Sequence, residues 1–190
     1  MKADLTDYNV IPLREVMAEY PQEYLSRIIS SFSCKRDTDV ESFLKDKAVM
    51  YEKRHLSRTY LMFADNESRD LEAYFAVAVS SMDVSGLECS SELRKKMNIN
   101  DGFAQSYLIG QIGKRDGGPS GLGRSALLCA MDTIISANLK AGCRVVRLDC
   151  KPSLVKYYTD SGFANTGKDE KKGLYRMIRI INTEVATASP

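Results

Sequence analysis

Five of the chain's twelve glycines stand in one short stretch, GKRDGGPSGLG, at residues 113–123. The stretch follows the apolar run QSYLIGQIG and precedes GRSALLCAMDTIISANLK, whose apolar spacing predicts a helix. The first amides of a helix have no acceptor inside it and lie at the positive end of its dipole. Glycines let a phosphate approach such amides closely. The stretch therefore predicts a phosphate-binding loop, with a tight strand-to-helix connection that binds nothing as the alternative.

Other residue types exclude several kinds of chemistry. The loop has neither the G-K-[ST] ending of a P-loop nor the G-x-G-x-x-G spacing of dinucleotide-binding folds. His55 is the only histidine, so Ser-His-Asp and Cys-His systems would all need it, and no histidine pair can bind a metal. It follows Lys53 and Arg54, where we expect a solvated histidine at a helix end. The five cysteines contain no C-x-x-C pair, so we expect no metal site and no disulfide framework.

The composition is that of a soluble protein of moderate size. With 190 residues, of which 44% are hydrophobic, we expect a single domain over residues 1–190. The 27 basic and 25 acidic residues leave a net charge of +2, which does not indicate a nucleic-acid-binding protein. No apolar run approaches the roughly 18 residues that a membrane helix needs, and the N-terminus is too polar for a signal peptide. We therefore expect a cytoplasmic protein with no membrane contact.

The hydrophobic pattern predicts alternating helices and strands. The segment RIISSFSC, residues 27–34, fits either an early strand or the end of a helix, and Asp39 is the predicted N-cap of the following helix. The predicted helices are 13–30 with an interruption at Pro21, 40–56, 123–140, and 152–162 with its end at Gly162. The predicted strands are 58–64 and 71–82, joined as a hairpin, then 105–114, 144–150 and 173–181. This order predicts an α/β fold with a mixed central sheet flanked by helices.

Two segments resemble the GNAT superfamily of N-acetyltransferases. GGPSGLGRSALL resembles its acyl-CoA pyrophosphate loop, Q/R-x-x-G-x-G/A, with Gly121 and Gly123 on the two glycines. VRLDCKPSLVKYYTDSGF resembles the later strand and helix of the same superfamily, in which a tyrosine precedes a terminal Gly-Phe. Gly118 departs from the usual Gln or Arg, and Pro119 removes one amide donor. Candidates for the missing positive charge are Lys114, Arg115 and Arg124.

Three earlier segments extend the resemblance toward the N-terminus. FSCKRDTDVESFLKDKA, SRTYLMFA and AYFAVAVSSM are similar to the GNAT branch that includes toxins acetylating aminoacyl-tRNA. The strand ending GQIGKRD departs from that branch's Leu-Ala-Val-Asp type of sequence. The resemblance implies a single GNAT-like domain, acetyl-CoA as cofactor, an amine acceptor and, within this branch, an antitoxin partner. A homodimer is also open.

The implied reaction is transfer of an acetyl group from the thioester of acetyl-CoA to an amine. Tyr158 occupies the family's tyrosine position and is the candidate general acid; the alternative is a core tyrosine that covers the sheet, as we expect for Tyr157. The resemblance places the cofactor against the amides and side chains of Gln111, Ile112, Gly113, Gly118, Ser120, Gly121, Leu122, Gly123 and Arg124.

A general base has no diagnostic position in the sequence. The candidates are Glu72, Asp83, Asp101 and Asp149, each of which also fits a turn or surface carboxylate. An α-amine has a pKa of about 7.7–8.0 and lysine one of about 10.4, so an α-amine needs little help from a base. This favours an aminoacyl-tRNA, a peptide N-terminus or a small amine as the acceptor.

The residues fit more than one kind of acceptor. We consider the α-amine of an aminoacyl-tRNA first; the alternatives are a protein or small-molecule N-acetyltransferase and an inactive acyl-CoA-binding module. Two groups of basic residues could flank a tRNA, unless Glu41, Asp46 and Glu52 make the first group an ion-paired, solvated face. The first group is Lys45, Lys47, Lys53, Arg54 and Arg58; the second is Arg94, Lys95 and Lys96.

Overall fold

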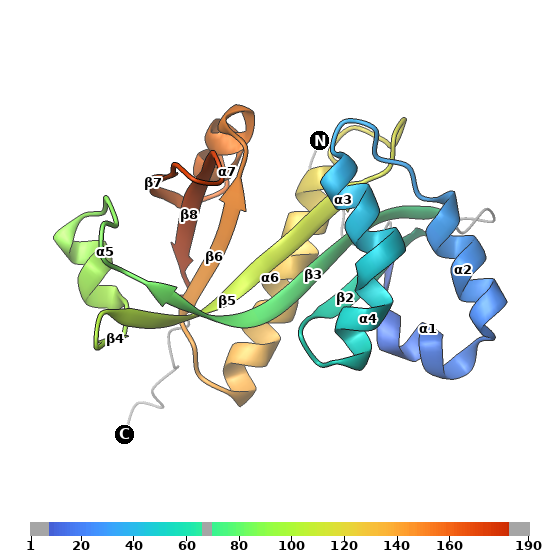
Figure 1. Cartoon of the computed structure of the whole chain (residues 1–190), viewed down its shortest axis with the longest axis horizontal. Helices are drawn as coiled ribbons and strands as arrows, with labels where there is room; N and C mark the ends of the chain where they lie inside the picture. The colour runs from blue at the N-terminus through green and yellow to red at the C-terminus, as the bar shows by residue number, and fades with distance from the viewer. Residues whose placement is uncertain (1–7, 66–69, 183–190) are drawn as a thin grey trace, which may run out of the picture. The chain divides into compact units, whose positions relative to one another are not determined.

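The computed structural model describes residues 8–65 and 70–182 (Figure 1). Its strands form a mixed sheet of eight in the order β1-β2-β3-β5-β6-β8-β7, with β4 paired to β5. The strands are β1 (Tyr8–Pro12), β2 (Arg58–Ala64), β3 (Leu71–Asp83), β4 (Ile99–Asn100), β5 (Phe103–Lys114), β6 (Val145–Cys150), β7 (Ala164–Asp169) and β8 (Leu174–Ile180). The α-helices are α1 (Leu13–Glu19), α2 (Gln22–Ser31), α3 (Thr38–Ser42), α4 (Ala48–Lys53), α5 (Ser91–Lys96), α6 (Leu122–Lys140) and α7 (Val155–Asp160).

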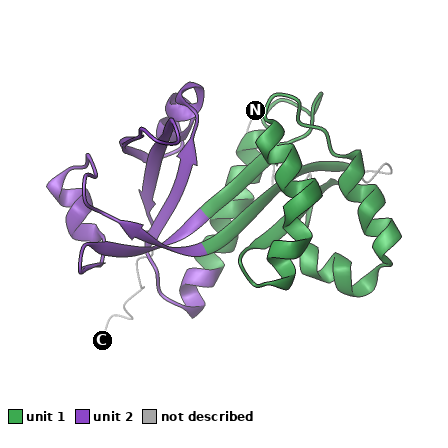
Figure 2. Cartoon of the chain, in the orientation of Figure 1, with its two compact units in different colours: residues 1–78, 109–136 green, residues 79–108, 137–190 purple. Residues whose placement is uncertain are grey.

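The chain divides into two compact units (Figure 2). The first unit comprises residues 1–78 and 109–136, and the second comprises residues 79–108 and 137–190. That residues 1–190 act as one GNAT-like domain stays a prediction. No helix among the described residues is both long enough and apolar enough to span a membrane.

In the first unit, the predicted hairpin forms as antiparallel strands β2 and β3, with Arg58 opposite Val77 and Leu61 opposite Tyr74. Leu61 and Tyr74 are buried against the helices between residues 13 and 48. α3 and α4 cover this face of the hairpin, while α6 runs along the other face (Figure 1). β1 pairs antiparallel with β2. The sequence prediction missed β1 because its five residues end in a proline and run directly into α1.

The helix predicted at 40–56 begins earlier and is not a uniform α-helix. It starts at Thr38, so Asp39 lies inside the first turn, and the prediction that Asp39 is the N-cap was wrong. A π-helical turn over Phe43–Lys47 separates α3 from α4. The segment 27–34 proved to be the end of a helix, because α2 continues to Ser31.

In the second unit, β6 pairs antiparallel with β8 and parallel with β5, where Tyr107 stands opposite Val146. A cluster of buried apolar side chains forms its core: Met82, Val84, Met97, Ala104, Val145 and Ile178. β7 pairs with β8 but was not predicted, since its sequence ANTGKD lacks apolar alternation. Thr166 is nevertheless buried there and donates its hydroxyl to the carbonyl of Arg176 at 3.0 Å.

Candidate functional site

The glycine loop connects β5, which ends at Lys114, to the 19-residue helix α6. The carbonyl of Gly121 accepts the amides of Arg124 at 2.8 Å and Ser125 at 3.0 Å, and these bonds start the helix. The amides of Ser120, Gly121 and Gly123 donate to no acceptor among the described residues. Because they lie at the positive end of a long helix, they form an arrangement suited to an anion.

The glycines of this loop are required for different reasons. Gly117 and Gly121 have positive φ angles of 68° and 90°, which other residues rarely adopt. A Cβ on Gly118 would lie 2.8 Å from Cδ2 of Leu122 and 3.2 Å from the carbonyl oxygen of Arg115. There is thus a steric reason for the departure from the family's Gln or Arg at this position.

Gly123 is different, because a Cβ there would meet nothing within 4 Å and its φ lies outside the left-handed region. The protein's own packing and backbone therefore do not demand glycine at this position. A phosphate lying against the helix amides would demand it, since a side chain would hold the anion away. The loop fits the pyrophosphate of an acyl-CoA in this respect.

The loop's three candidate cations have different partners. The guanidinium of Arg115 donates to the buried carboxylate of Glu72 from Nε at 2.8 Å and from Nη2 at 2.7 Å. This hydrogen bond raises the pKa of Arg115. Lys114 and Arg124 make no ion pair with a described residue. They remain the candidates for phosphate contacts, whereas Arg115 is already engaged.

The end of β5 carries the three residues predicted to face the pantetheine arm: Gln111, Ile112 and Gly113. Gly113 has a packing reason, since a Cβ there would collide with a methyl group of Val40 and lie 3.2 Å from Cε1 of Tyr74. The hydroxyl of Tyr74, a residue of β3, donates to the Val40 carbonyl at 2.5 Å, and this hydrogen bond holds α3 against β3. Pairing of these strand amides with a cofactor stays a prediction.

Tyr158 belongs to the second unit, where α7 ends in a Schellman motif. The amide of Phe163 donates to the carbonyl of Tyr158 at 3.0 Å, and the amide of Gly162 donates to that of Thr159 at 2.9 Å. Gly162 has the left-handed φ of 85° that this motif needs. The sequence pattern Tyr-x-x-x-Gly-Phe therefore marks the C-terminal end of helix α7.

The same motif fixes the ring of Tyr158. Its centroid lies 5.9 Å from that of Phe163 and 5.0 Å from that of Tyr157, both edge to face. The side chain is buried, with 5% of the residue exposed. The position of the ring is thus set by short-range contacts within the second unit, and the role of its hydroxyl stays a prediction.

The four carboxylates considered as general bases have different surroundings. Glu72 binds Arg115, and Asp149 accepts from Nε and Nη2 of Arg147 at 3.1 and 2.7 Å. Asp83 accepts the Ser85 amide at 2.7 Å, and hydrogen bonds from Ser85 lower the pKa of this carboxyl. Asp101 lies in a turn with a φ of 48°. Asp83 and Asp101 fit the interpretation as turn carboxylates. Glu72 does not fit the interpretation as a turn or surface carboxylate, because it is buried within β3.

Several of the predicted basic residues are paired. Glu41 binds Lys45 at 2.6 Å, Glu52 binds Arg58 at 2.7 Å and Glu92 binds Lys96 at 2.7 Å. Glu52 is not on a solvated face as predicted; it is buried and accepts the Thr59 amide at 3.0 Å. Arg94 donates to the carbonyl of Val84 at 3.0 and 3.2 Å. Within the two groups, four basic residues are exposed and form no ion pair with a described residue: Lys47, Lys53, Arg54 and Lys95.

His55 is exposed and follows α4, as expected for a histidine at a helix end. Its Nδ1 lies 2.8 Å from Nη2 of Arg58. No group of three or more His, Cys, Asp or Glu side chains that could hold a metal ion occurs within residues 8–65 and 70–182.

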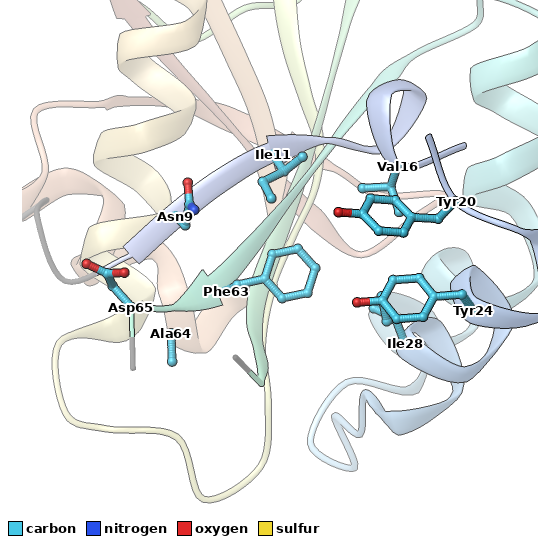
Figure 3. A pocket seen from close by; sticks show the side chains of 9 residues that line it. All are labelled: Asn9, Ile11, Val16, Tyr20, Tyr24, Ile28, Phe63, Ala64 and Asp65. Atoms are coloured by element: carbon cyan, nitrogen blue, oxygen red, sulfur yellow. The ribbon is translucent and has the colours of Figure 1, made fainter. Parts of the chain in front are cut away.

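A separate cavity of about 210 Å³ lies in the first unit beside β1 (Figure 3). The rings of Tyr20 and Tyr24 stack at 4.8 Å between centroids, and both hydroxyls point toward the side of Phe63. The lining contains none of the residues predicted for the cofactor or for catalysis. The cavity and the glycine loop are therefore distinct features of this unit.

No protein-family model and no curated protein sequence matches the chain. Solved structures match nearly all of it. AtaT complexed with acetyl-methionyl-tRNAfMet is 18% identical, with 89% of this chain and 94% of the AtaT chain covered and a TM-score of 0.69. A KacT variant with one tyrosine replaced by phenylalanine is 15% identical, with 92% of this chain and 95% of the KacT chain covered and a TM-score of 0.72. An AtaT variant toxin bound to the C-terminus of the antitoxin AtaR and to acetyl-CoA is 16% identical, with 92% of this chain and 93% of the AtaT chain covered and a TM-score of 0.65.

The chain has the fold of AtaT and KacT. The predicted fold class, a GNAT-like mixed central sheet flanked by helices, is therefore confirmed. The resemblance inferred from the glycine loop and from the segment that contains Tyr158 predicted this same fold. At 15 to 18% identity, this likeness concerns the fold of the chain.

Proposed function

We propose that the protein is an acetyl-CoA-dependent N-acetyltransferase of the toxin type. The observation that carries the proposal is the open space at Gly123, beside three amides that have no acceptor among the described residues. The pyrophosphate of acetyl-CoA would lie against this loop, over Gly118, Ser120, Gly121, Leu122, Gly123 and Arg124. AtaT, which has the same fold, binds acetyl-CoA and supports this assignment.

Acetyl-CoA, when bound, supplies an activated acetyl thioester. The amides of Gln111, Ile112 and Gly113 would hold the pantetheine arm and donate to the thioester oxygen as it gains charge. The amine nitrogen would form a bond to the acetyl carbon as the carbon–sulfur bond breaks, and the amine would lose one proton to water. Tyr158 would give its phenolic proton to the departing thiolate. Tyrosine-to-phenylalanine variants of AtaT and KacT exist as structures, and we propose Tyr158 as the equivalent tyrosine.

The acceptor that we propose is the α-amine of an aminoacyl-tRNA. Glu72, Asp83 and Asp149 each accept hydrogen bonds within the protein, and Asp101 lies in a turn. An α-amine is therefore the more suitable nucleophile, because its pKa is closer to neutral pH than that of lysine and a larger fraction of it is unprotonated there. AtaT is complexed with acetyl-methionyl-tRNA, which supports this choice of acceptor. The antitoxin bound to AtaT likewise supports an antitoxin as a partner of this protein. A homodimer remains a further prediction.

The test measures transfer of radiolabelled acetyl groups from acetyl-CoA to charged tRNA, to a peptide N-terminus and to a small amine. We expect transfer to charged tRNA that weakens steeply with added salt, because displaced counterions oppose rebinding. Transfer only to the peptide or the small amine would instead identify a protein or small-molecule N-acetyltransferase. Acetyl-CoA binding with no transfer to any acceptor would identify an inactive acyl-CoA-binding module.

Tyr158→Phe tests the proton donor, and Tyr157→Phe is its matched control on the preceding residue. Both changes keep an aromatic ring and remove one hydroxyl. We expect Tyr158→Phe to lower kcat by about 10²- to 10⁴-fold with little change in acetyl-CoA affinity. Tyr157→Phe should retain most of the activity. Equal kcat values for Tyr158→Phe and the unmodified protein would remove Tyr158 from the mechanism.

A further inference from the structure

Arg115 and Asp116 stand directly before the loop glycines, and both bind segments that are distant in the sequence. The Arg115 amide donates to the Glu72 carbonyl at 2.8 Å, in addition to the two bonds from its guanidinium to the Glu72 carboxylate. The Glu72 side chain is only 6% exposed. The start of the loop is therefore joined to β3 through both main chain and side chain.

Asp116 makes an equivalent set of contacts with the segment between α2 and α3. Its amide donates to the Ser33 carbonyl at 2.8 Å. One oxygen of its carboxylate, Oδ2, accepts the Ser33 hydroxyl at 2.9 Å and the Lys35 amide at 3.0 Å. These hydrogen bonds lower the pKa of Asp116. The segment is itself held by α3, because the Cys34 amide donates to Glu41 at 2.6 Å.

Such anchoring matters because the following loop is rich in glycine. Glycine loses more conformational freedom than any other residue when its backbone is fixed. An unanchored chain with four glycines between residues 117 and 123 would present its amides in the binding arrangement only part of the time. The apparent Kd for an anion rises in inverse proportion to that fraction.

We propose that Asp116, with Arg115, is a positioning residue for phosphate binding by the glycine loop. The two side chains hold the start of the loop through two separate partners, β3 and the 33–35 segment, so that the amides of Ser120, Gly121 and Gly123 are preorganised. The inference rests on the proposed function, because it assumes that an acyl-CoA is the ligand. It adds that affinity for acyl-CoA is coupled to the order of the 33–35 segment, far from the loop in sequence.

The test compares Asp116→Ala and Ser33→Ala with the unmodified protein, using calorimetry with CoA and with acetyl-CoA. We expect Asp116→Ala to raise the Kd for both ligands by about tenfold or more and to leave kcat at saturating acetyl-CoA within about twofold. Ser33→Ala should give a smaller rise. The double variant should be no worse than Asp116→Ala alone, because both changes remove the same interaction.

Glu92→Ala is the matched control, since it removes a carboxylate from the exposed ion pair with Lys96. It should leave both Kd values unchanged. A Kd for Asp116→Ala equal to that of the unmodified protein would overturn the inference, as would a fall in kcat without any rise in Kd. Failure of the proposed function has a different signature: the unmodified protein would bind CoA but transfer no acetyl group.

Hydrogen exchange supplies a readout that needs no ligand and detects a variant that fails to fold. In Asp116→Ala, the Lys35 amide should exchange faster because it loses its acceptor. The two hydrogen-bonded amides of the loop, those of Gly118 and Leu122, should also exchange faster because the loop loses its anchor. The amides within β2 and β3 should keep their protection. Unchanged exchange at Lys35 and in the loop would overturn the anchoring argument.

Discussion

Breaking the ion pair between Glu72 and Arg115 from its two ends should cost different amounts of stability. The Glu72 side chain is 6% exposed and that of Arg115 is 36% exposed, so water reaches the arginine side chain far more than the carboxylate. Arg115→Met leaves a buried carboxylate without its partner. Glu72→Gln leaves a guanidinium that can be rehydrated, and the new amide can still accept one of its hydrogen bonds.

The magnitudes follow from this difference in burial. Removing one partner of a fully buried pair costs about 3–5 kcal/mol, and an exposed pair contributes about 0–1 kcal/mol. For Arg115→Met we expect a loss of about 2–3 kcal/mol, because the charge left behind is buried. For Glu72→Gln we expect about 1 kcal/mol, because the charge left behind is partly solvated.

Urea unfolding followed by far-UV circular dichroism at neutral pH measures both losses as shifts of the midpoint at constant slope. The double variant should be more stable than the sum of the two losses predicts, since no unpaired buried charge remains. Equal losses for the two single variants, or a larger loss for Glu72→Gln, would refute the argument from burial.

Three further predictions concern the loop, a thiol and a carboxyl group. Gly123→Glu should unfold at the same urea concentration as the unmodified protein, since nothing lies within 4 Å of the new Cβ. Calorimetry should show that this variant binds acetyl-CoA at least about tenfold more weakly, and equal affinity would place the pyrophosphate elsewhere. Burial raises the pKa of Cys150 to about 11, so at pH 8 a thiol reagent should modify the partly exposed Cys89 before Cys150. Mass spectrometry detects the modified cysteine, and faster modification of Cys150 would contradict this prediction. The pKa of the Asp116 carboxyl is lowered, chiefly by the hydrogen bond from the Lys35 amide, so the hydrogen bonds of this carboxylate persist at pH values above the ordinary pKa of 3.8 and are lost only as the pH falls below it. A titration midpoint of Asp116 above pH 3.8, measured by carboxyl NMR, would contradict the anchor.

Most of the helices and strands could be predicted because their signals are local. The hairpin β2–β3 and the helix α6 follow from apolar periodicity and from the polar or glycine-rich residues at their ends. β1, β4 and β7 were missed because each is short or polar, and a partner strand stabilises it. The start of α3 was misplaced by two residues, since Asp37 and Asp39 are both acceptable N-caps.

The candidate site divides in the same way. The glycine loop and the Tyr-x-x-x-Gly-Phe helix end are short motifs whose geometry is determined within a few residues, so both could be recognised in the sequence. The partners of Arg115 and Asp116 could not be predicted, because they lie 43 and 83 residues away. The burial of Glu52 was also missed, since its spacing in the helix resembles that of a solvated residue.

The sequence by itself determined that glycines gather before a helix, but only the tertiary structure decided why each is there. Gly113 makes room for Val40 of α3, and Gly118 makes room for Leu122, whereas the space beside Gly123 is open. Backbone preferences act between neighbouring residues and are therefore visible in sequence order. Steric contacts and ion pairs join residues that only the folded chain brings together, so the open space at Gly123 and the anchor at Asp116 became apparent only in three dimensions.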